Sequence, residues 1–410
     1  MIQRLLILIL SIQFVSCTKQ TVTNGFLIAD ETQATSIYVD PNCDPLIFWA
    51  AEELSKDIER ITGAKPNVIK TNAQKETGIY IGEAKDELLT TLTPTNDSLS
   101  GKWEAFSIQN TQQNIVITGS DVRGTVYGVF ELAEQLGVSP WQWWADVVPL
   151  KKEKLQLELA EKSIVQSPSV QYRGIFLNDE DWGLQPWAAK TFDTETGDIG
   201  PKTYEKIFQL LLRLKANTIW PAMHPCTQGF FTVEGNAGMA EKYHMVIGTS
   251  HAEPMMRNNV AEWNHNFGKY DYSTNKKRIN EYWQSRITEI KEKNVNTIMT
   301  LGMRGIHDSG MEGVSSLAEG MAFVDTIMTT QRTMLSTTLE KPITQIPQVF
   351  IPYKEVLYIY DEGLKVPEDV TLMWTDDNYG YIRRLSNEEE QKRIGGSGVY
   401  YHLSYWGRPH

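Results

Sequence analysis

The chain has 410 residues, of which 22% are charged and 41% hydrophobic, a composition typical of an ordinary globular protein and not of a disordered one. Its length suggests two or three domains. The formal net charge of −12 argues against a nucleic-acid partner, because the sequence has no basic stripe that would neutralise phosphates. The 12 Trp and 17 Tyr suit sugar binding, since each ring offers an apolar face and a polar edge, although large cores use such rings too.

The first 17 residues predict an export signal. They combine one early positive charge, an apolar stretch and a small residue before Cys17, and they are too short for a stable spanning helix. Residues 14–17, Phe-Val-Ser-Cys, resemble a bacterial lipoprotein processing site, in which Cys17 becomes the lipidated first residue. Ordinary secretion stays open, because the usual Leu three positions before the cysteine is absent. We expect export to the periplasm or cell surface, with a lipid anchor in a bacterial membrane, and no disulfide between Cys43 and Cys226.

Residues 27–165 predict a small, non-catalytic α+β domain. The pattern indicates amphipathic helices over residues 48–63 and 123–137, each ending in glycine, together with a strand over 78–82 and a hairpin formed by 103–109 and 114–119. The second helix reads GxxYGVFELxEQLGV and precedes a Trp-rich segment. That combination resembles the N-terminal domain found ahead of barrels in several glycosidase families. Residues 151–168 are expected to be a partly strand-like connector.

From residue 169 onward, strands and helices alternate, which indicates βαβ units and a parallel sheet. The expected strands are residues 172–177, 217–220, 245–248, 295–301, 347–352, 370–374 and 398–401. The expected helices are residues 203–215, 237–243, 276–293, 322–339, 356–364 and 387–394. The fold class predicted is therefore α/β, with the small α+β domain followed by an incomplete TIM-type (β/α)8 barrel over residues 169–410. The chain stops soon after the seventh of eight strands, so we expect a fragment of a longer protein.

Polar and ionisable side chains follow these strands. In a (β/α)8 barrel the carboxyl ends of the strands line the active site, and burying a lone carboxylate in a core is costly. The side chains concerned are Asn178, Asp179, Trp220, His224, His251, Glu253, Arg304, Asp308, Glu355, Asp376, Asp377, Asn378, His402 and Tyr405. The acids after the first strand would by themselves also fit a solvated loop that caps a helix. The repetition of the pattern favours one common site.

Facing carboxylates fit glycoside hydrolysis, in which one acid protonates the leaving oxygen and the other activates water or attacks directly. Arg304 among them fits a substrate that carries its own carboxylate, because a guanidinium binds a carboxylate with two parallel hydrogen bonds. Trp220 and Tyr405 are candidates for stacking on a sugar ring.

A metal site is the main competing chemistry. His224, His251, His307 and His402 have acids near them in the sequence and could bind zinc. None of these histidines shows the short spacing of a helix or strand ligand pair, and a barrel would have to assemble the ligands from different strands. We expect no metal and no cofactor. The sequence also contains no GxSxG elbow, phosphate-binding loop or dinucleotide-binding glycine pattern.

Several segments together resemble glycoside hydrolase family 115, the α-glucuronidases of xylan breakdown. They are residues 173–181 (RGIFLNDED), 217–224 (NTIWPAMH), 248–255 (GTSHAEPM), 301–308 (LGMRGIHD), 353–355 (YKE), 374–380 (WTDDNYG) and 401–405 (YHLSY). The resemblance implies removal of 4-O-methyl-α-D-glucuronic acid from O2 of xylose in glucuronoxylan or its oligosaccharides, with inversion and without a metal. It also implies that the full-length protein continues through further domains and forms a homodimer.

Carried over by position, the resemblance assigns Arg304 to the uronate carboxylate, helped by His251 or His402. Asp308 and Glu355 are the leading acid/base candidates, with Asp179 and Asp376 behind them, and which carboxylate acts as acid stays open. Asn178, Trp220 and Tyr405 would bind the sugar. Inversion predicts that the working carboxylates stand roughly 6.5–9.5 Å apart, which leaves room for a water.

Two alternatives remain at this point. One is a hexosaminidase-like glycosidase on the same domain plan, which would use the substrate's acetamide as nucleophile and a paired Asp-Glu at one strand end. The acids at 179–180 and 376–377 fit that pair poorly, and Arg304 would have no role. The other is a non-catalytic glycan-binding lipoprotein at the cell surface, which would need aromatic platforms but not several carboxylates and an Arg around one pocket.

Overall fold

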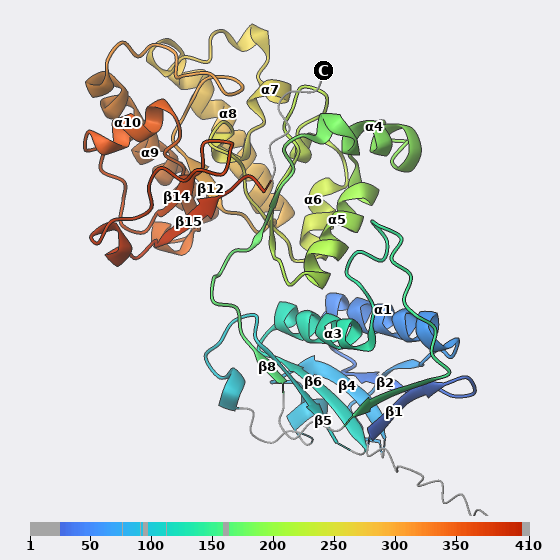
Figure 1. The fold of residues 1–410 in the computed structure, drawn as a ribbon. Coiled ribbons are helices and arrows are strands. Elements are labelled where there is room, and N and C mark those ends of the chain that lie inside the picture. The colour runs from blue at the N-terminus through green and yellow to red at the C-terminus, as the bar shows by residue number, and fades with distance from the viewer. Residues whose placement is uncertain are drawn as a thin grey trace, which may run out of the picture.

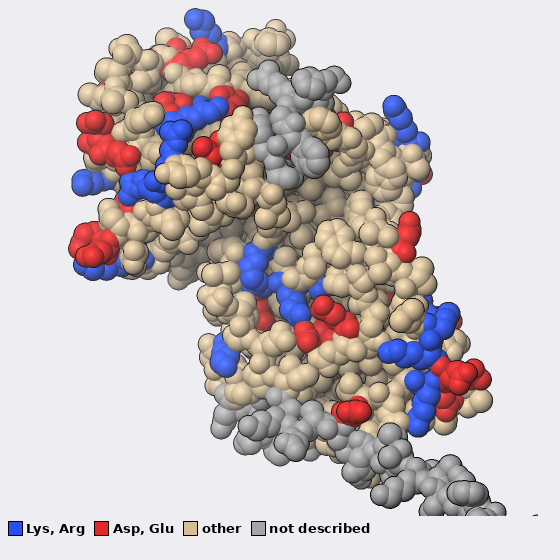
Figure 2. Space-filling model, viewed as in Figure 1, with Lys and Arg blue, Asp and Glu red and all other residues tan. Residues whose placement is uncertain are grey.

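A computed structural model describes residues 25–75, 77–90, 92, 97–111, 113–158 and 164–403. It has two parts: a sheet covered by two long helices, and a larger part in which parallel strands alternate with helices (Figure 1). This arrangement confirms the expected mixed α/β fold. Figure 2 shows basic and acidic side chains interspersed on the face in view. None of the helices in the described ranges is both long and apolar enough to cross a membrane.

The first part is built on a six-stranded sheet with the order β3-β2-β4-β6-β5-β8. Strands β3, β2, β4 and β6 are mutually parallel, and β5 runs antiparallel to both β6 and β8. A separate antiparallel pair joins β1 to β7. The bounds are β1 Gly25–Asp30, β2 Ile37–Val39, β3 Val68–Lys70, β4 Gly78–Glu83, β5 Phe106–Asn110, β6 Asn114–Gly119, β7 Lys154–Glu158 and β8 Ile164–Gln166.

Helices α1 (Pro45–Thr62) and α3 (Val122–Leu136) lie side by side across one face of this sheet (Figure 1). Both end at a left-handed glycine, as the sequence indicates, and both begin at a capping aspartate that was not singled out from the sequence. Asp121, for example, accepts a hydrogen bond from the backbone N of Gly124 at 2.8 Å. Their apolar faces form the core with the sheet. The short helix α2 (Glu87–Thr90) packs with two tyrosines on the other face.

Within its described residues, the second part contains seven parallel strands in chain order. Strands β9 to β11 form one sheet and β12 to β15 another, and a parallel bridge between Ile247 and Thr297 links the two. The strands are β9 Gly174–Phe176, β10 Thr218–Trp220, β11 Val246–Ile247, β12 Met299–Leu301, β13 Gln348–Phe350, β14 Thr371–Thr375 and β15 Ser397–Tyr400. The helices are α4 Leu184–Trp187, α5 Pro201–Arg213, α6 Asn236–Lys242, α7 Asn259–Glu262, α8 Tyr272–Lys293, α9 Leu317–Leu339 and α10 Glu355–Asp361.

The alternation of strands and helices is as the sequence predicts, with three differences. Strands β9 to β13 are shorter than the apolar runs that signalled them, whereas β14 and β15 have the predicted length. The short helices α4 and α7 were not predicted. The helix expected over residues 387–394 is a single 3₁₀ turn at Glu390–Lys392, because Asn387 and Arg384 engage the Glu390 carboxylate and hold the segment as a turn.

The two parts are in direct contact through α1, α3 and α5. The Arg213 guanidinium on α5 donates to the buried Asp57 carboxylate on α1 at 2.8 Å. The Tyr127 hydroxyl on α3 donates to the backbone carbonyl of Ala216 at 3.1 Å. These contacts tie the amino ends of the parallel strands to the first part, so the carboxyl ends point away from it.

Candidate active site

The parallel strands place polar side chains at their common carboxyl edge, and Arg304 lies at the centre of the best-defined group. Arg304 follows β12 and is only 2% exposed. Its Nε and Nη2 donate to the two carboxylate oxygens of Glu355, both at 2.8 Å, and its Nη1 donates to Asp308. Since Glu355 follows β13, residues 51 positions apart in sequence form a bidentate ion pair. The structure therefore brings together three residues that the sequence singled out.

Asp308 receives two further donors. His251 Nε2 lies 3.0 Å from one Asp308 oxygen, and the Lys354 ammonium donates to the other. Burial acts to raise the pKa of the Asp308 carboxyl, but the hydrogen bonds from His251 and Lys354 and the charge of Arg304 outweigh it and hold that pKa below its ordinary value. Asp308 is therefore an ionised carboxylate at neutral pH.

His251 is kept neutral. Its burial lowers the pKa of the imidazole, although the nearby Asp308 carboxylate opposes the shift. A neutral ring that donates from Nε2 to Asp308 leaves Nδ1 as an acceptor, and Nδ1 has no hydrogen-bond partner among the described residues. The ring lies 4.4 Å from the Tyr353 ring, centroid to centroid.

The loop after β9 forms a second polar group. His224 connects two of its residues: Nδ1 lies 2.8 Å from an Asp181 oxygen and Nε2 lies 2.9 Å from Asn178 Oδ1. Asp179, between them, is half-buried, and this burial raises the pKa of its carboxyl although His224 and His402 oppose the shift. Glu180 turns inward and accepts hydrogen bonds from the backbone N of Met223 at 2.7 Å. The pKa of the Asp179 carboxyl is thus raised above its ordinary value by burial.

The loops after β14 and β15 meet at a buried carboxylate. Asp376 is 2% exposed, its Oδ1 lies 2.6 Å from His402 Nδ1, and its Oδ2 accepts from the backbone N of Gly380 at 2.9 Å. The Tyr400 ring packs against two neighbouring rings: its centroid lies 5.2 Å from that of His402 and 5.4 Å from that of Trp220. Tyr400 was absent from the sequence-based candidates, because a tyrosine at the end of a strand gives no signal of which way it points.

The remaining predicted residues have less direct placements. Trp220 is 8% exposed and its ring packs on Phe176 and Tyr400, so little of the ring faces solvent. Tyr405 and Cys17 lie outside the described residues. Glu253 is buried, and desolvation, with repulsion from Glu262 and Glu180, raises the pKa of its carboxyl well above the ordinary value.

Lys354 is a site residue that the sequence reasoning missed. Its partner Asp308 lies 46 positions away in the sequence, so the contact could not be predicted from spacing. The one indication that Lys354 belongs to the site is its position between Tyr353 and Glu355, in a segment that resembles the family.

Loops at this edge contain residues with a left-handed backbone conformation, as do several loops elsewhere in the described residues. Five loops that follow parallel strands each contain a non-glycine residue with positive φ: Asp179 (122°), Met255 (57°), His307 (63°), Lys354 (50°) and Asn378 (73°). Each such conformation costs of order 1–3 kcal/mol and is retained only where the surroundings enforce it. The strain therefore indicates that these loops are built to hold particular side chains in place.

Comparison with known families identifies the chain. Residues 165–410, more than half of it, match the family described as glycosyl hydrolase family 115. The chain is also similar to a solved family GH115 4-O-methyl-α-glucuronidase with specificity for decorated arabinogalactans, with 46% sequence identity, a TM-score of 0.86 and coverage of 94% of this chain. The chain belongs to glycosyl hydrolase family 115. It spans half the length of that solved relative, whose chain is covered to 50%.

Other matches bear on the fold of this family 115 chain. Residues 21–132 match the family described as the glycosyl hydrolase family 67 N-terminus. A chitobiase from Flavobacterium johnsoniae shares 13% identity at a TM-score of 0.53, with 92% of this chain and 63% of that chain covered, which shows a similar fold and nothing further. No curated protein matches the chain. Within the described residues, no three His, Cys, Asp or Glu side chains are grouped so that they could hold a metal ion.

Proposed function

We propose that this family 115 protein is an α-glucuronidase that removes (4-O-methyl)-α-D-glucuronic acid side chains from a polysaccharide. The observation that carries the proposal is the buried Arg304 guanidinium, bracketed by Asp308 and Glu355 at the carboxyl edge of the parallel strands. A cation at this depth suits a substrate with its own carboxylate. The solved relative at 46% identity is described as a 4-O-methyl-α-glucuronidase.

The proton roles follow from the surroundings of each carboxyl. Asp179, whose pKa is raised by burial, is the group that we assign to protonate the leaving oxygen. Asp308 stays ionised among His251, Lys354 and Arg304 and stabilises positive charge on the sugar. Glu355 has both oxygens on Arg304, so it becomes free to activate water when the uronate carboxylate replaces it there. This order of events gives hydrolysis with inversion.

The substrate we propose first is glucuronoxylan, with its α-1,2-linked uronic acids on xylose. A decorated arabinogalactan is the second candidate, because the 46% identical relative is described as specific for that class. Both substrates present the same uronate to Arg304, so the choice between them depends on groups that contact the polysaccharide backbone.

We also propose the wider organisation of the protein. Residues 169–410 belong to a (β/α)8 barrel, supported by seven parallel strands in chain order, and residues 27–165 form a non-catalytic domain, supported by the family 67 N-terminus match. Export through residues 1–17 with a lipid anchor at Cys17, and a homodimeric full-length protein, remain proposals from the sequence.

The test is proton NMR of glucuronoxylan and, separately, of a uronic-acid-decorated arabinogalactan during incubation with the protein. Because the chain spans half the length of its relative, a chain of the relative's length is assayed beside it. We expect free uronic acid to appear first as the β anomer. Release of the α anomer first would reject inversion, and no release from either polysaccharide by either chain would reject the α-glucuronidase assignment.

A further inference from the structure

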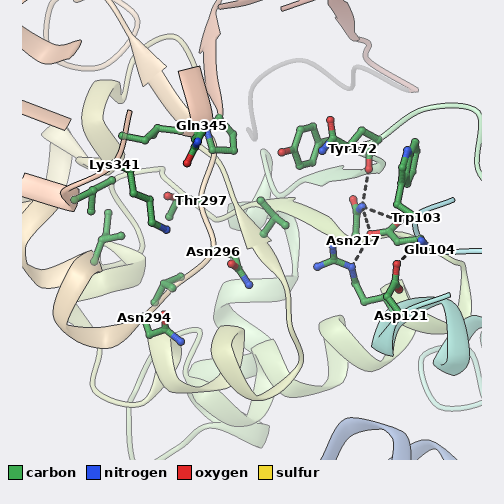
Figure 3. Close-up of a pocket in the computed structure, with 18 of the residues that line it drawn as sticks. Trp103, Glu104, Asp121, Tyr172, Asn217, Asn294, Asn296, Thr297, Lys341 and Gln345 are labelled. Carbon is green, nitrogen blue, oxygen red and sulfur yellow. Dashed lines mark hydrogen bonds and ion pairs between the residues drawn. The ribbon is translucent and has the colours of Figure 1, made fainter. Parts of the chain in front are cut away.

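A second cavity lies at the opposite end of the parallel strands from Arg304. Its volume is about 590 Å³, within the range of pockets that hold small ligands. One wall comes from the first part of the chain and the starts of β9 and β10, and the other comes from the ends of α8 and α9 and the segments that lead into β12 and β13 (Figure 3). The lining residues from the second part lie at or before the starts of the strands, whereas Arg304 and Glu355 follow them, so at least a strand length, about 10 Å, separates this cavity from the candidate active site.

The first wall is fixed by a network around Glu104. The carboxylate of Glu104, 4% exposed, accepts from Arg123 Nε at 2.6 Å, from Arg173 Nη2 at 2.5 Å and from Asn217 Nδ2 at 2.8 Å. Asp121 accepts from the backbone N of Glu104 at 2.6 Å. Two acids face two arginines, so this wall is electrostatically balanced, and its groups are already engaged with one another.

The second wall is different, because its polar groups are not engaged. The side chains of Asn294, Asn296, Thr297 and Gln345 make no hydrogen bond within the described part of the chain, and the Lys341 ammonium pairs with none of its residues. Lys291 on the same wall is paired with Glu340 at 3.1 Å. The wall therefore offers three amides, one hydroxyl and one unpaired positive charge toward the cavity (Figure 3).

Trp103 supplies an aromatic face on the fixed wall, opposite these groups (Figure 3). Its side chain is 41% exposed, and the half-buried ring of Tyr172 lines the same cavity. A pyranose ring places its C–H face on an aromatic ring and directs its hydroxyls to amides, and a uronate adds one negative charge. An exposed indole, free amides and one free ammonium around one cavity match those three features together.

We propose that this cavity is a second, non-catalytic binding site for an acidic glycan. Trp103 is the stacking platform, the free amides of the second wall contact hydroxyl groups, and Lys341 binds a uronate carboxylate. Such a site would hold one substituted segment of a polysaccharide while another segment occupies the Arg304 site. The proposal rests on the proposed function for its choice of ligand, but binding at this cavity can be measured without hydrolysis.

The test is calorimetric titration of the chain carrying Arg304→Ala, which disables the first site, with a uronic-acid-substituted xylo-oligosaccharide. An unsubstituted xylo-oligosaccharide of the same length is titrated in parallel. We expect binding to persist in Arg304→Ala and to weaken about tenfold or more when Trp103→Ala is added, as for a stacked aromatic anchor. Lys341→Ala should weaken only the acidic ligand, by about three- to tenfold. Trp141→Ala is the matched control, since that indole is 47% exposed and does not line the cavity, and it should change nothing.

The outcomes separate the site from the function. Trp103-dependent and Lys341-dependent binding supports the site even if the parent chain hydrolyses neither polysaccharide, a result that would reject only the proposed activity. Binding that disappears with Arg304→Ala alone, or that is unchanged by both Trp103→Ala and Lys341→Ala, overturns the second site even if hydrolysis is normal. Because Lys341 is exposed, its variant folds and keeps the test valid if Trp103→Ala is unstable.

Discussion

At the scale of single residues, the proposed hydrolysis depends on which carboxylates bind the Arg304 guanidinium. Arg304 is buried, and its charge is compensated by a two-point contact with Glu355 and a further contact with Asp308. Removing one partner of a buried ion pair strongly destabilises the folded protein, because the other charge is then left unpaired. In the proposed mechanism, an incoming uronate replaces Glu355 on Arg304, so the guanidinium stays paired while the Glu355 carboxylate is released to act as the proposed base.

Replacing Arg304 by lysine should separate charge from geometry. Arg304→Lys keeps one positive charge but cannot make the two parallel hydrogen bonds that fix Glu355. We expect kcat/KM on a uronic-acid-substituted oligosaccharide to fall by about 100-fold or more, since small misplacements of reacting groups have effects of that size. Arg332→Lys is the control, because Arg332 on α9 pairs with Asp369 before the start of β14, away from the carboxyl ends of the strands, and should leave the rate near the parent value. A parent-like rate for Arg304→Lys would remove the bidentate role.

Because the pKa of the buried Glu253 is raised, we expect the stability of the protein to fall as the pH rises. Its folded-state pKa is raised well above 4.5, so on raising the pH the unfolded chain loses this proton before the folded chain does. The folded state then binds more protons, and stability falls as pH rises above about 4.5. Glu253→Gln removes this loss and should raise the melting temperature at pH 7 while giving no gain at pH 4. An equal shift at both pH values would show that the effect comes from packing and not from ionisation.

Part of the site could be predicted from residue types and order. Arg304, Asp308 and Glu355 were predictable because each follows a buried parallel strand and such ends share one edge. The contact of Lys354 with Asp308 was not, because it depends on the turn that places φ of Lys354 at 50°. Trp220 shows the opposite limit: a strand-end tryptophan can face a sugar or the interior, and the sequence does not distinguish the two.

At the scale of elements, the residues at helix ends located the limits of helices better than apolar runs located the limits of strands. Helices α1 and α3 start at Asp44 and Asp121 and end at Gly63 and Gly137, near the predicted limits. Strands buried on both faces read as continuous apolar runs without an internal marker of where pairing stops, so the strands predicted for β9 to β13 were too long. The three-residue strands β2 and β3 were missed, because so short a segment carries no measurable alternation, whereas β8 lies in the connector that was expected to be partly strand-like.

Gly174 in β9 provides a test of strand contact. A Cβ atom at this position would lie 1.7 Å from the carbonyl oxygen of Thr218 on the paired strand β10, a backbone atom that cannot turn aside. We expect Gly174→Ala to lower the free energy of unfolding by about 1–3 kcal/mol through overpacking. Gly238→Ala in α6 is the matched control, because nothing lies within 4 Å of its Cβ and helical alanine is favoured by about 0.5–1 kcal/mol. The free energies of unfolding of both variants are measured by urea denaturation. An unchanged value for Gly174→Ala would contradict the close contact between β9 and β10.

At the scale of the whole molecule, the ion pair between Arg213 and Asp57 that joins the two parts could not be predicted from the sequence. Arg213 on α5 and Asp57 on α1 lie 156 positions apart, and neither stands in a motif. Glu53 adds a second acceptor, 3.3 Å from Arg213 Nη2, and the Arg213 guanidinium lies 4.5 Å from the centre of the Phe130 ring on α3. One side chain on α5 therefore engages both helices that cover the first sheet, and it sets the amino ends of the parallel strands against that layer.

Removing Arg213 should destabilise the assembly of the two parts. Arg213→Ala leaves the Asp57 carboxylate, 0% exposed, with the 45% exposed Arg60 as its remaining cation and a 3.3 Å hydrogen bond from Gln142, and we expect a loss of about 3 kcal/mol or more in urea denaturation. Lys202→Ala is the control, because Lys202 lies on the same helix as Arg213 but forms an exposed ion pair with Glu195. This variant should change the free energy of unfolding by less than about 0.5 kcal/mol. Adding Asp57→Asn to Arg213→Ala should recover part of the loss, since no unpaired charge then remains buried. A double variant as unstable as the sum of its single variants would show that packing around Phe130, and not the charge, is what Arg213 contributes.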